Sequence, residues 1–155
     1  MTECVMCNGT TNDELGNIII ANIKNSGQHL TGVFDAEHPF LYTTGNIVKN
    51  LPELFIFFNP QKIAGLINYL CDIQRKRNEP FYDGEIIDIG AKCPLMAIVP
   101  DDRILEYATI STSFANTLGM PVSFVQILAP DTNGVFPTNP NCKPPYNVPV
   151  LRAVS

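Results

Sequence analysis

Two cysteines near the start of the chain, Cys4 and Cys7, have the spacing of half a metal site or of a redox pair. A structural zinc ion needs four ligands, and the sequence has no second Cys-x-x-Cys pair and no His-x-x-x-His pair. His29 and His38 could complete a Cys2His2 site if the N-terminal segment folded back onto them. A redox pair normally follows a strand and opens a helix, whereas a short polar stretch separates Cys7 from the first predicted helix. Two thiols without a metal are the simpler interpretation, and zinc at Cys4 and Cys7 is the alternative.

The chain lacks the sequence patterns of nucleophilic and phosphate-binding enzymes. It contains no Gly-x-Ser-x-Gly elbow, no Gly-x-Gly-x-x-Gly loop and no Walker pattern. A catalytic triad would need His29 or His38 beside a serine or a cysteine, and His38 stands before a proline in a predicted hairpin. These features favour a noncatalytic binding protein. A small hydrolase or a zinc-dependent enzyme using Cys4 and Cys7 is one alternative, and a protein–protein inhibitor is another.

Hydrophobic spacing and turn residues predict the elements that would position such a site. The run 54–58 is apolar throughout, which predicts a strand buried on both faces. Asn59 and Pro60 follow it as a helix cap and a first helical residue. In chain order we predict a helix over 12–26, strands over 29–35, 40–43 and 54–58, a helix over 60–77, strands over 85–89 and 93–99, a helix over 100–117 and a strand over 122–128.

The amino-acid composition of the chain changes after residue 128. Prolines crowd the remaining residues and exclude regular secondary structure, at Pro130, Pro137, Pro140, Pro144, Pro145 and Pro149. Apolar residues such as Phe136, Tyr146 and Leu151 could anchor this stretch. We therefore predict a core domain over 1–128 and an irregular proline-rich arm over 129–155, packed on the core or on a neighbouring subunit.

The predicted elements make an α+β fold. We expect a mainly antiparallel sheet of about six strands with three helices packed on one face. Only 16% of the residues are charged while 45% are hydrophobic, so much of the surface must be uncharged. Such a surface favours a homo-oligomer or another partner.

Charge and hydropathy restrict the partners and the location. A net charge of -5 disfavours nonspecific nucleic-acid binding, which depends on neutralising phosphates. No segment has the apolar length of a membrane span, and the N-terminus lacks a basic region followed by an apolar core. We expect a cytoplasmic protein.

Several short motifs resemble those of one family. They are Tyr42-Thr43-Thr44-Gly45, Pro52-Glu53-Leu54, Val125-Gln126-Ile127-Leu128-Ala129-Pro130-Asp131 and Gly134-Val135-Phe136-Pro137. In order and spacing the chain is similar to domain-of-unknown-function family 4262, a bacterial and phage-borne family of unassigned activity, from Cys4 to about Leu151. The chain departs from the family pattern at four places, with Gln28, Ala129 and Thr138 where the family has tryptophan and Leu51 where it has histidine. The resemblance implies a fold and a site location, and it places the protein in the bacterial host cytoplasm if a phage encodes it.

The shared residues could form the rim of one pocket that binds a small polar ligand. We predict that the ligand-binding residues are Tyr42, Thr43, Thr44, Glu53, Gln126, Asp131 and Phe136. A nucleotide-like signal molecule, sequestered as in phage counter-defence, is the ligand that the resemblance and the missing catalytic groups suggest. In the competing interpretation Tyr42 belongs to the core, Gln126 bonds only to backbone, and Asp131 makes a turn with Gly134.

Overall fold

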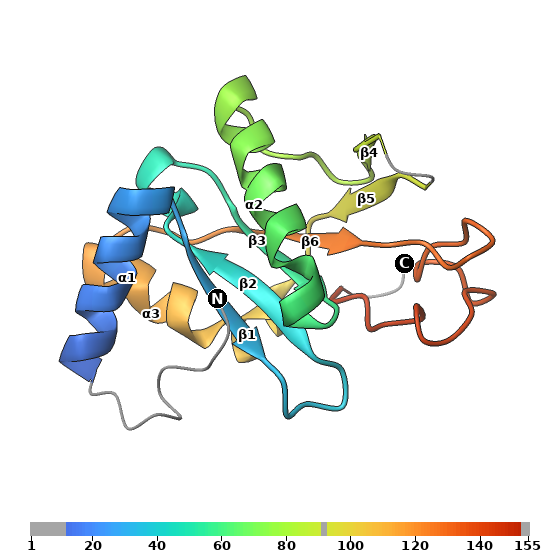
Figure 1. Cartoon of the computed structure of the whole chain (residues 1–155), viewed down its shortest axis with the longest axis horizontal. Coiled ribbons are helices and arrows are strands. Elements are labelled where there is room, and N and C mark those ends of the chain that lie inside the picture. Colours follow the sequence, from blue (N-terminus) through green and yellow to red (C-terminus); the bar gives the residue numbers. More distant parts are fainter. Residues whose placement is uncertain (1–11, 91–92, 153–155) are drawn as a thin grey trace.

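The structure is a computed structural model that describes residues 12–90 and 93–152 (Figure 1). Its elements in chain order are α1 (Asn12–Ser26), β1 (His29–Val33), β2 (Phe40–Thr44), the 3-10 helix η2 (Asn46–Lys49), β3 (Glu53–Phe57), α2 (Pro60–Arg77), β4 (Ile86–Ile87), β5 (Leu95–Ile98), the 3-10 helix η3 (Asp102–Glu106), α3 (Thr109–Leu118) and β6 (Phe124–Leu128). Residues 129–152, here called the C-terminal segment, contain turns but no helix or strand.

The six strands form one mixed sheet in the order β1-β2-β3-β6-β5-β4. Every neighbouring pair is antiparallel except β3 and β6, which run parallel at the centre of the sheet. The α+β class, the three helices and the mainly antiparallel six-stranded sheet are therefore confirmed. The parallel pair results from the long connection between β3 and β6, which carries α2, β4, β5 and α3.

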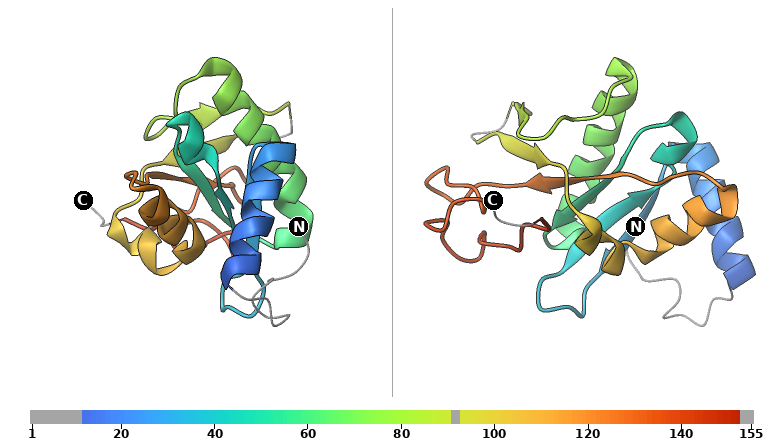
Figure 2. Two further views of the ribbon diagram at one scale, coloured as in Figure 1. Left: turned by 90° about the vertical axis from the view of Figure 1, so that its left-hand side faces the viewer. Right: turned by 180° about the vertical axis from the view of Figure 1, so that it is seen from behind.

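Helices cover both faces of this sheet, so the expectation that they share one face is wrong (Figure 2). The central strands have apolar side chains on both faces: Leu54 and Ile56 pack with α2, whereas Phe55 and Phe57 pack with η3 and the loop before α3. A strand that is apolar on both faces must be covered on both. The buried run 54–58 already implied this second layer.

Helix α2 begins and ends where its sequence signals lie. The Asn59 side chain accepts a hydrogen bond from the Gln61 amide at 3.0 Å, and Pro60 takes the first helical position. Buried Ile63, Ile67 and Leu70 recur at the spacing of one helical face. Asn78 ends the helix in the left-handed conformation.

The predicted helix over 100–117 is instead two short helices, η3 and α3, separated at Tyr107 and Ala108. Asp101 caps η3 by accepting from the Arg103 amide at 3.0 Å. The interruption places the Tyr107 ring against Phe40, Phe55 and Phe57, with ring centroids 5.4–5.9 Å apart. Tertiary contact between aromatic rings thus overrides a continuous helix.

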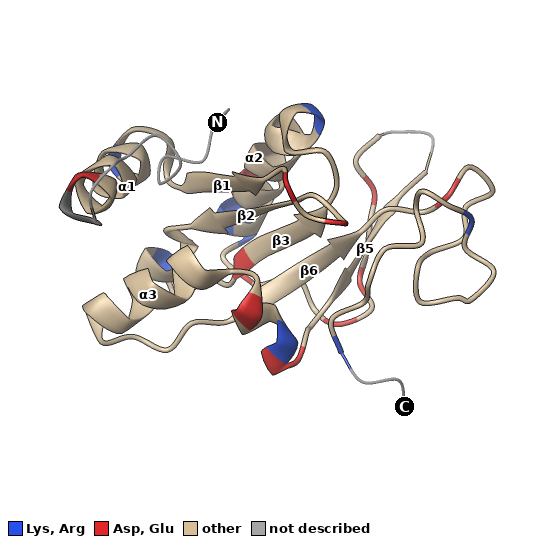
Figure 3. Cartoon of the chain, turned by 90° about the horizontal axis from the view of Figure 1, so that it is seen from below, with Lys and Arg blue, Asp and Glu red and all other residues tan. Residues whose placement is uncertain are grey.

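Charged residues are few, and they are dispersed along the ribbon of the described chain (Figure 3). No described helix combines the length and the apolar character that crossing a membrane requires. The net charge of -5 and this dispersal leave no long basic band along the ribbon.

Candidate functional site

The proposed metal ligands Cys4 and Cys7 lie outside the described residues. Among the described residues no group of three or more His, Cys, Asp and Glu side chains is close enough to hold a metal ion. His29 is buried, and its Nδ1 lies 2.8 Å from Asn22 Nδ2. Burial lowers the pKa of His29, which keeps the ring neutral and able to accept from Asn22.

A fully buried carboxylate, Glu53, organises the turn between β2 and β3. It accepts from Thr43 Oγ1 at 2.8 Å and from the backbone amides of Gly45, Asn46 and Ile47 at 2.9, 3.0 and 3.3 Å. Burial raises the pKa of Glu53, and these four donors oppose that rise. Glu53 therefore acts as an internal cap for η2, and each of its oxygens is already occupied by protein groups.

A chain of polar side chains continues from this carboxylate toward the surface. Asn46 accepts from Arg75 Nη2 at 2.9 Å, the same nitrogen donates to Gln28, and Gln28 donates to Asn68 at 2.6 Å. A hollow of about 180 Å³ lies at the outer end, lined by Asn22, Ser26, Gln28, Leu30 and Asn68. This network of hydrogen bonds satisfies the buried side-chain amides and connects the segment before β1 with η2 and α2.

Tyr42 and Gln126 lie on one face of the sheet but do not face a common cavity. Tyr42 pairs with Phe55 and Phe55 with Gln126, so the buried Phe55 ring separates them. Tyr42 is itself 1% exposed and stacks on Phe40 and Phe55. Thr44 Oγ1 lies 2.8 Å from the hydroxyl of Ser111 on α3.

Gln126 and Asp131 hold the C-terminal segment. Gln126 donates to the Pro149 carbonyl at 2.8 Å and accepts from the Leu151 amide at 2.9 Å. Asp131 accepts from the amides of Asn133, Val135 and Lys143, and its pKa is lowered by these hydrogen bonds. The structure thus brings Thr43 and Glu53 together, but it does not gather the seven predicted residues into one cleft. Half-buried Phe136 lies in the C-terminal segment, directly after Val135, whose amide donates to Asp131. The structure matches the competing interpretation for Tyr42, Gln126 and Asp131.

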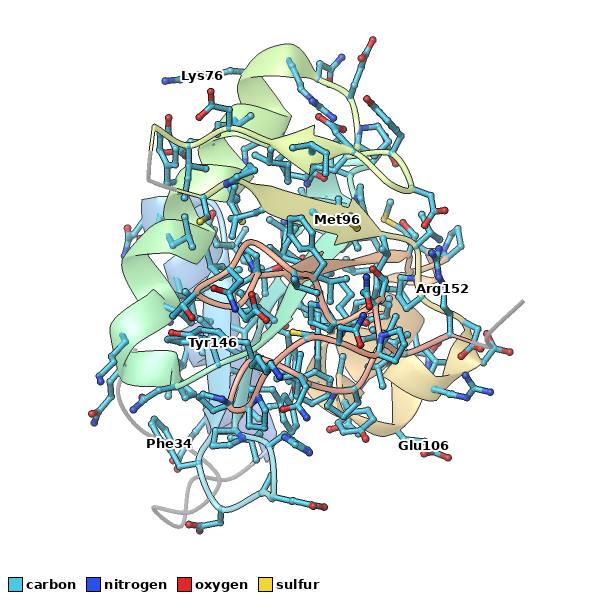
Figure 4. All side chains as sticks on the ribbon, turned by 90° about the vertical axis from the view of Figure 1, so that its right-hand side faces the viewer. Phe34, Lys76, Met96, Glu106, Tyr146 and Arg152 are labelled. Carbon is cyan, nitrogen blue, oxygen red and sulfur yellow. The ribbon has the colours of Figure 1, made fainter. Side chains whose placement is uncertain are left out.

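A larger pocket, here called the strand-end pocket, lies where β3 and β6 end. Its volume is about 350 Å³, and its lining residues are Glu37, His38, Pro39, Phe57, Phe58, Asn59, Lys62, Ile127, Ala129, Pro145, Tyr146 and Val148. Three parts of the chain that are distant in sequence meet there: the β1–β2 turn, the junction of β3 with α2, and the C-terminal segment (Figure 4). A pocket of this size can enclose much of a small organic ligand.

The Asn59 side chain already caps α2, but three other polar side chains of the strand-end pocket form no hydrogen bond or ion pair within the described chain. Within the described chain, Glu37 and Lys62 form no ion pair and no side-chain hydrogen bond. The His38 ring makes only an edge contact with Phe57, at 6.1 Å between centroids. These three side chains can therefore bind a ligand without breaking an existing hydrogen bond or ion pair of the described chain.

None of the seven residues predicted to bind a ligand lines this pocket. The sequence did contain one signal for it, since 54–58 followed by Asn59 and Pro60 is a buried strand that leads directly into a helix. Ligand sites are common at the carboxyl ends of parallel strands. However, the parallel partner of β3 is distant in sequence, so the second half of this edge could not be recognised.

A comparison with protein families shows one match. The model of a family described as "Domain of unknown function (DUF4262)" matches residues 22–143, well over half of the chain. No curated protein and no solved structure matches the chain.

Proposed function

The chain belongs to the DUF4262 family, and we propose that it is a noncatalytic protein that binds a small ligand in the strand-end pocket. The observation that carries this proposal is the contrast between its two sets of polar groups. Buried Glu53 and Gln126 form hydrogen bonds with other groups of the protein. Glu37, His38 and Lys62 line a pocket, and their side chains form no hydrogen bond or ion pair in the described chain. Ligand sites combine apolar walls with a few unused polar groups in this way.

The position of the pocket supports the same proposal. It lies at the carboxyl ends of β3 and β6, the parallel pair of the sheet. Phe58 and Asn59 follow one strand, and Ala129 follows the other. In sheets with parallel strands this edge is the usual place for ligands, because the strands end there and the next elements diverge.

The residues that line the pocket favour binding over a reaction. They include no serine, threonine or cysteine that could act as a nucleophile beside His38. A nucleotide-like ligand suits the lining, because its base could stack on aromatic rings while Lys62 attracts its phosphate. We propose sequestration of such a signal molecule in the cytoplasm as the cellular role.

Thermal unfolding with a panel of bacterial nucleotides, nucleosides and aromatic metabolites tests this proposal. A ligand present at 100 times its Kd stabilises the folded state by about 2.7 kcal/mol. At this chain length each kcal/mol raises Tm by roughly 2–4 °C. Chromatography of the mixture should recover the ligand unchanged.

Two tryptophan variants locate the site. Ala129→Trp would place an indole ring in the strand-end pocket and should abolish the thermal shift, whereas Thr138→Trp adds the same side chain at an exposed residue outside the pocket. If no compound shifts Tm, or if both variants bind as the wild type does, the strand-end pocket is not the ligand site. Conversion of a ligand at enzyme-like rates would contradict the noncatalytic role.

A further inference from the structure

We propose that the ligand is a planar ring that carries two separate polar groups, an anionic group and a hydrogen-bond-donating nitrogen group. The anion binds Lys62, the nitrogen group binds Glu37, and the ring lies on the aromatic wall of the strand-end pocket. This inference rests on the proposed function and specifies the class of ligand. Purine nucleotides and aromatic amino acids share this chemistry.

The aromatic wall favours a flat ligand. Four rings line the pocket, those of His38, Phe57, Phe58 and Tyr146. His38 already meets Phe57 edge to face, and Tyr146 reaches the pocket from the C-terminal segment beside α2 (Figure 4). Aromatic rings prefer offset or edge-to-face contact with other rings, so a planar ring uses this wall better than a branched aliphatic ligand does.

Lys62 has an unusual place for a lysine. It lies in the first turn of α2, where the helix dipole is positive, and that turn contains no acidic residue. The nearby amides of Gln61 and Lys62 are already bonded to Asn59, so an incoming anion would be held by the lysine side chain. An anion at the pocket would offset the unfavourable position of this unpaired charge.

Glu37 supplies the opposite charge to the same pocket. It forms no ion pair with Lys62, so the two charged groups are more than 4 Å apart and each can contact a different polar group of one ligand. A ligand whose two polar groups are both anionic would be repelled by Glu37. The amine of an amino acid or the exocyclic amine of guanine would instead donate to its carboxylate.

A matched set of indole compounds tests this assignment. L-Tryptophan has both groups, tryptamine lacks the carboxylate, and indole-3-propionate lacks the amine. The chain contains no tryptophan, so indole fluorescence reports only the probe. Guanosine 5′-monophosphate and guanosine, measured by calorimetry, give the nucleotide series with and without the anion.

The variants assign each polar group of the ligand. Lys62→Gln should weaken the parent compound roughly three- to tenfold and leave tryptamine or guanosine unchanged, whereas Glu37→Gln should weaken tryptophan similarly and leave indole-3-propionate unchanged. Lys76→Gln is the matched control, since Lys76 lies near the other end of α2 and does not line the pocket (Figure 4). If the indole compounds show these changes in affinity, the ligand is an aromatic amino acid. If the guanosine compounds show them, the ligand is a purine nucleotide.

Two results would overturn the assignment. One is equal affinity for the parent and its truncated analogues, and the other is an equal effect of Lys62→Gln and Lys76→Gln. If none of these probes binds while another compound binds wild type and not Ala129→Trp, the ligand class is wrong and the proposed function stands. If no compound binds, both fail.

Discussion

Apart from Thr31 Oγ1 and Gln74 Oε1, the buried polar side chains of the described chain have partners within the protein, and Glu53 is the clearest case. Its carboxylate is fully buried and receives four hydrogen bonds, three of them from the backbone of the turn that it closes. Such a group costs free energy to bury but leaves unsatisfied donors if it is removed. Thr43 and Glu53 therefore have a structural role. The side chains that we propose for ligand binding are Glu37, His38 and Lys62 of the strand-end pocket.

Glu53→Gln should destabilise the protein although the side chain keeps its shape. One carboxylate oxygen becomes an NH2 group, which would face backbone N–H donors. We expect the free energy of unfolding to fall by about 1–3 kcal/mol in urea titrations. Glu79→Gln, at an exposed residue, should change it by less than about 0.5 kcal/mol. Equal stability of the two variants would show that the carboxylate does not organise the turn.

His29 should give the protein a specific dependence on pH. Its pKa is lowered in the folded state, so the unfolded chain takes up the proton first as the pH falls through the ordinary value of 6.5. The wild type should therefore lose stability relative to His29→Gln between pH 7.5 and pH 5.5. The pKa of Glu53 is raised in the folded state, so Glu53 changes the stability with pH in the opposite direction to His29. Both proteins contain Glu53, so comparing them cancels its contribution. Parallel curves of Tm against pH would exclude this role for His29.

The turn from β2 into η2 is the element on which the Glu53 contacts depend. Gly45 has φ 125°, a conformation that L side chains rarely adopt, and its amide donates to Glu53. A Cβ at Gly45 would lie 2.7 Å from Ile23 Cγ1 on α1. The turn thus links α1, β2 and β3 through one glycine.

Gly45→Ala should cost about 2–4 kcal/mol, from backbone strain together with the contact with Ile23. Gly65→Ala is the matched control at an exposed position of α2, where an added Cβ meets nothing within 4 Å. That substitution should stabilise the protein by about 0.5–1 kcal/mol, because alanine favours a helix interior. Urea titrations of both variants should therefore shift in opposite directions, and a shared direction would contradict this account of the turn.

Local signals predicted the elements well where one segment decides the outcome. The Asn59 cap, the apolar face of α2 and the two-sided burial of β3 could all be read from neighbouring residues. The division of the predicted helix over 100–117 could not, because it depends on Tyr107 meeting rings from β2 and β3. Likewise the strand predicted over 85–89 is reduced to β4, which is only two residues long.

The site was harder to predict than the elements, because it exists only where distant segments meet. Gln126 was predicted to contact a ligand because it is polar within an apolar strand. In the structure its side chain instead forms hydrogen bonds with the backbone of Pro149 and Leu151. The strand-end pocket needs the parallel pairing of β3 and β6, which no local pattern specifies. Ala129 lines this pocket with a small side chain, at a position where the resemblance to family 4262 leads us to expect tryptophan.

At the scale of the whole molecule, the C-terminal segment completes one face of the sheet. Leu151 is 4% exposed and belongs to the same buried cluster as Phe55 and Phe57, and Val148 packs against this cluster. The Leu151 carbonyl also accepts from the Asp101 amide at 2.8 Å. The segment therefore closes the aromatic core and forms a wall of the strand-end pocket at the same time.

Ending the chain after Lys143 should lower the free energy of unfolding by roughly 3–6 kcal/mol. Loss of the buried Leu151 accounts for about 1.5–3 kcal/mol, and Gln126 would lose both backbone partners in a buried position. The control ends after Arg152 and keeps every one of these contacts. Urea unfolding of the shorter chain should still be one transition at lower midpoint, because the segment and the sheet share a core. If the two truncated proteins unfold at the same midpoint, the segment contributes nothing to the core, and the pocket wall that it forms is not held in place by Gln126.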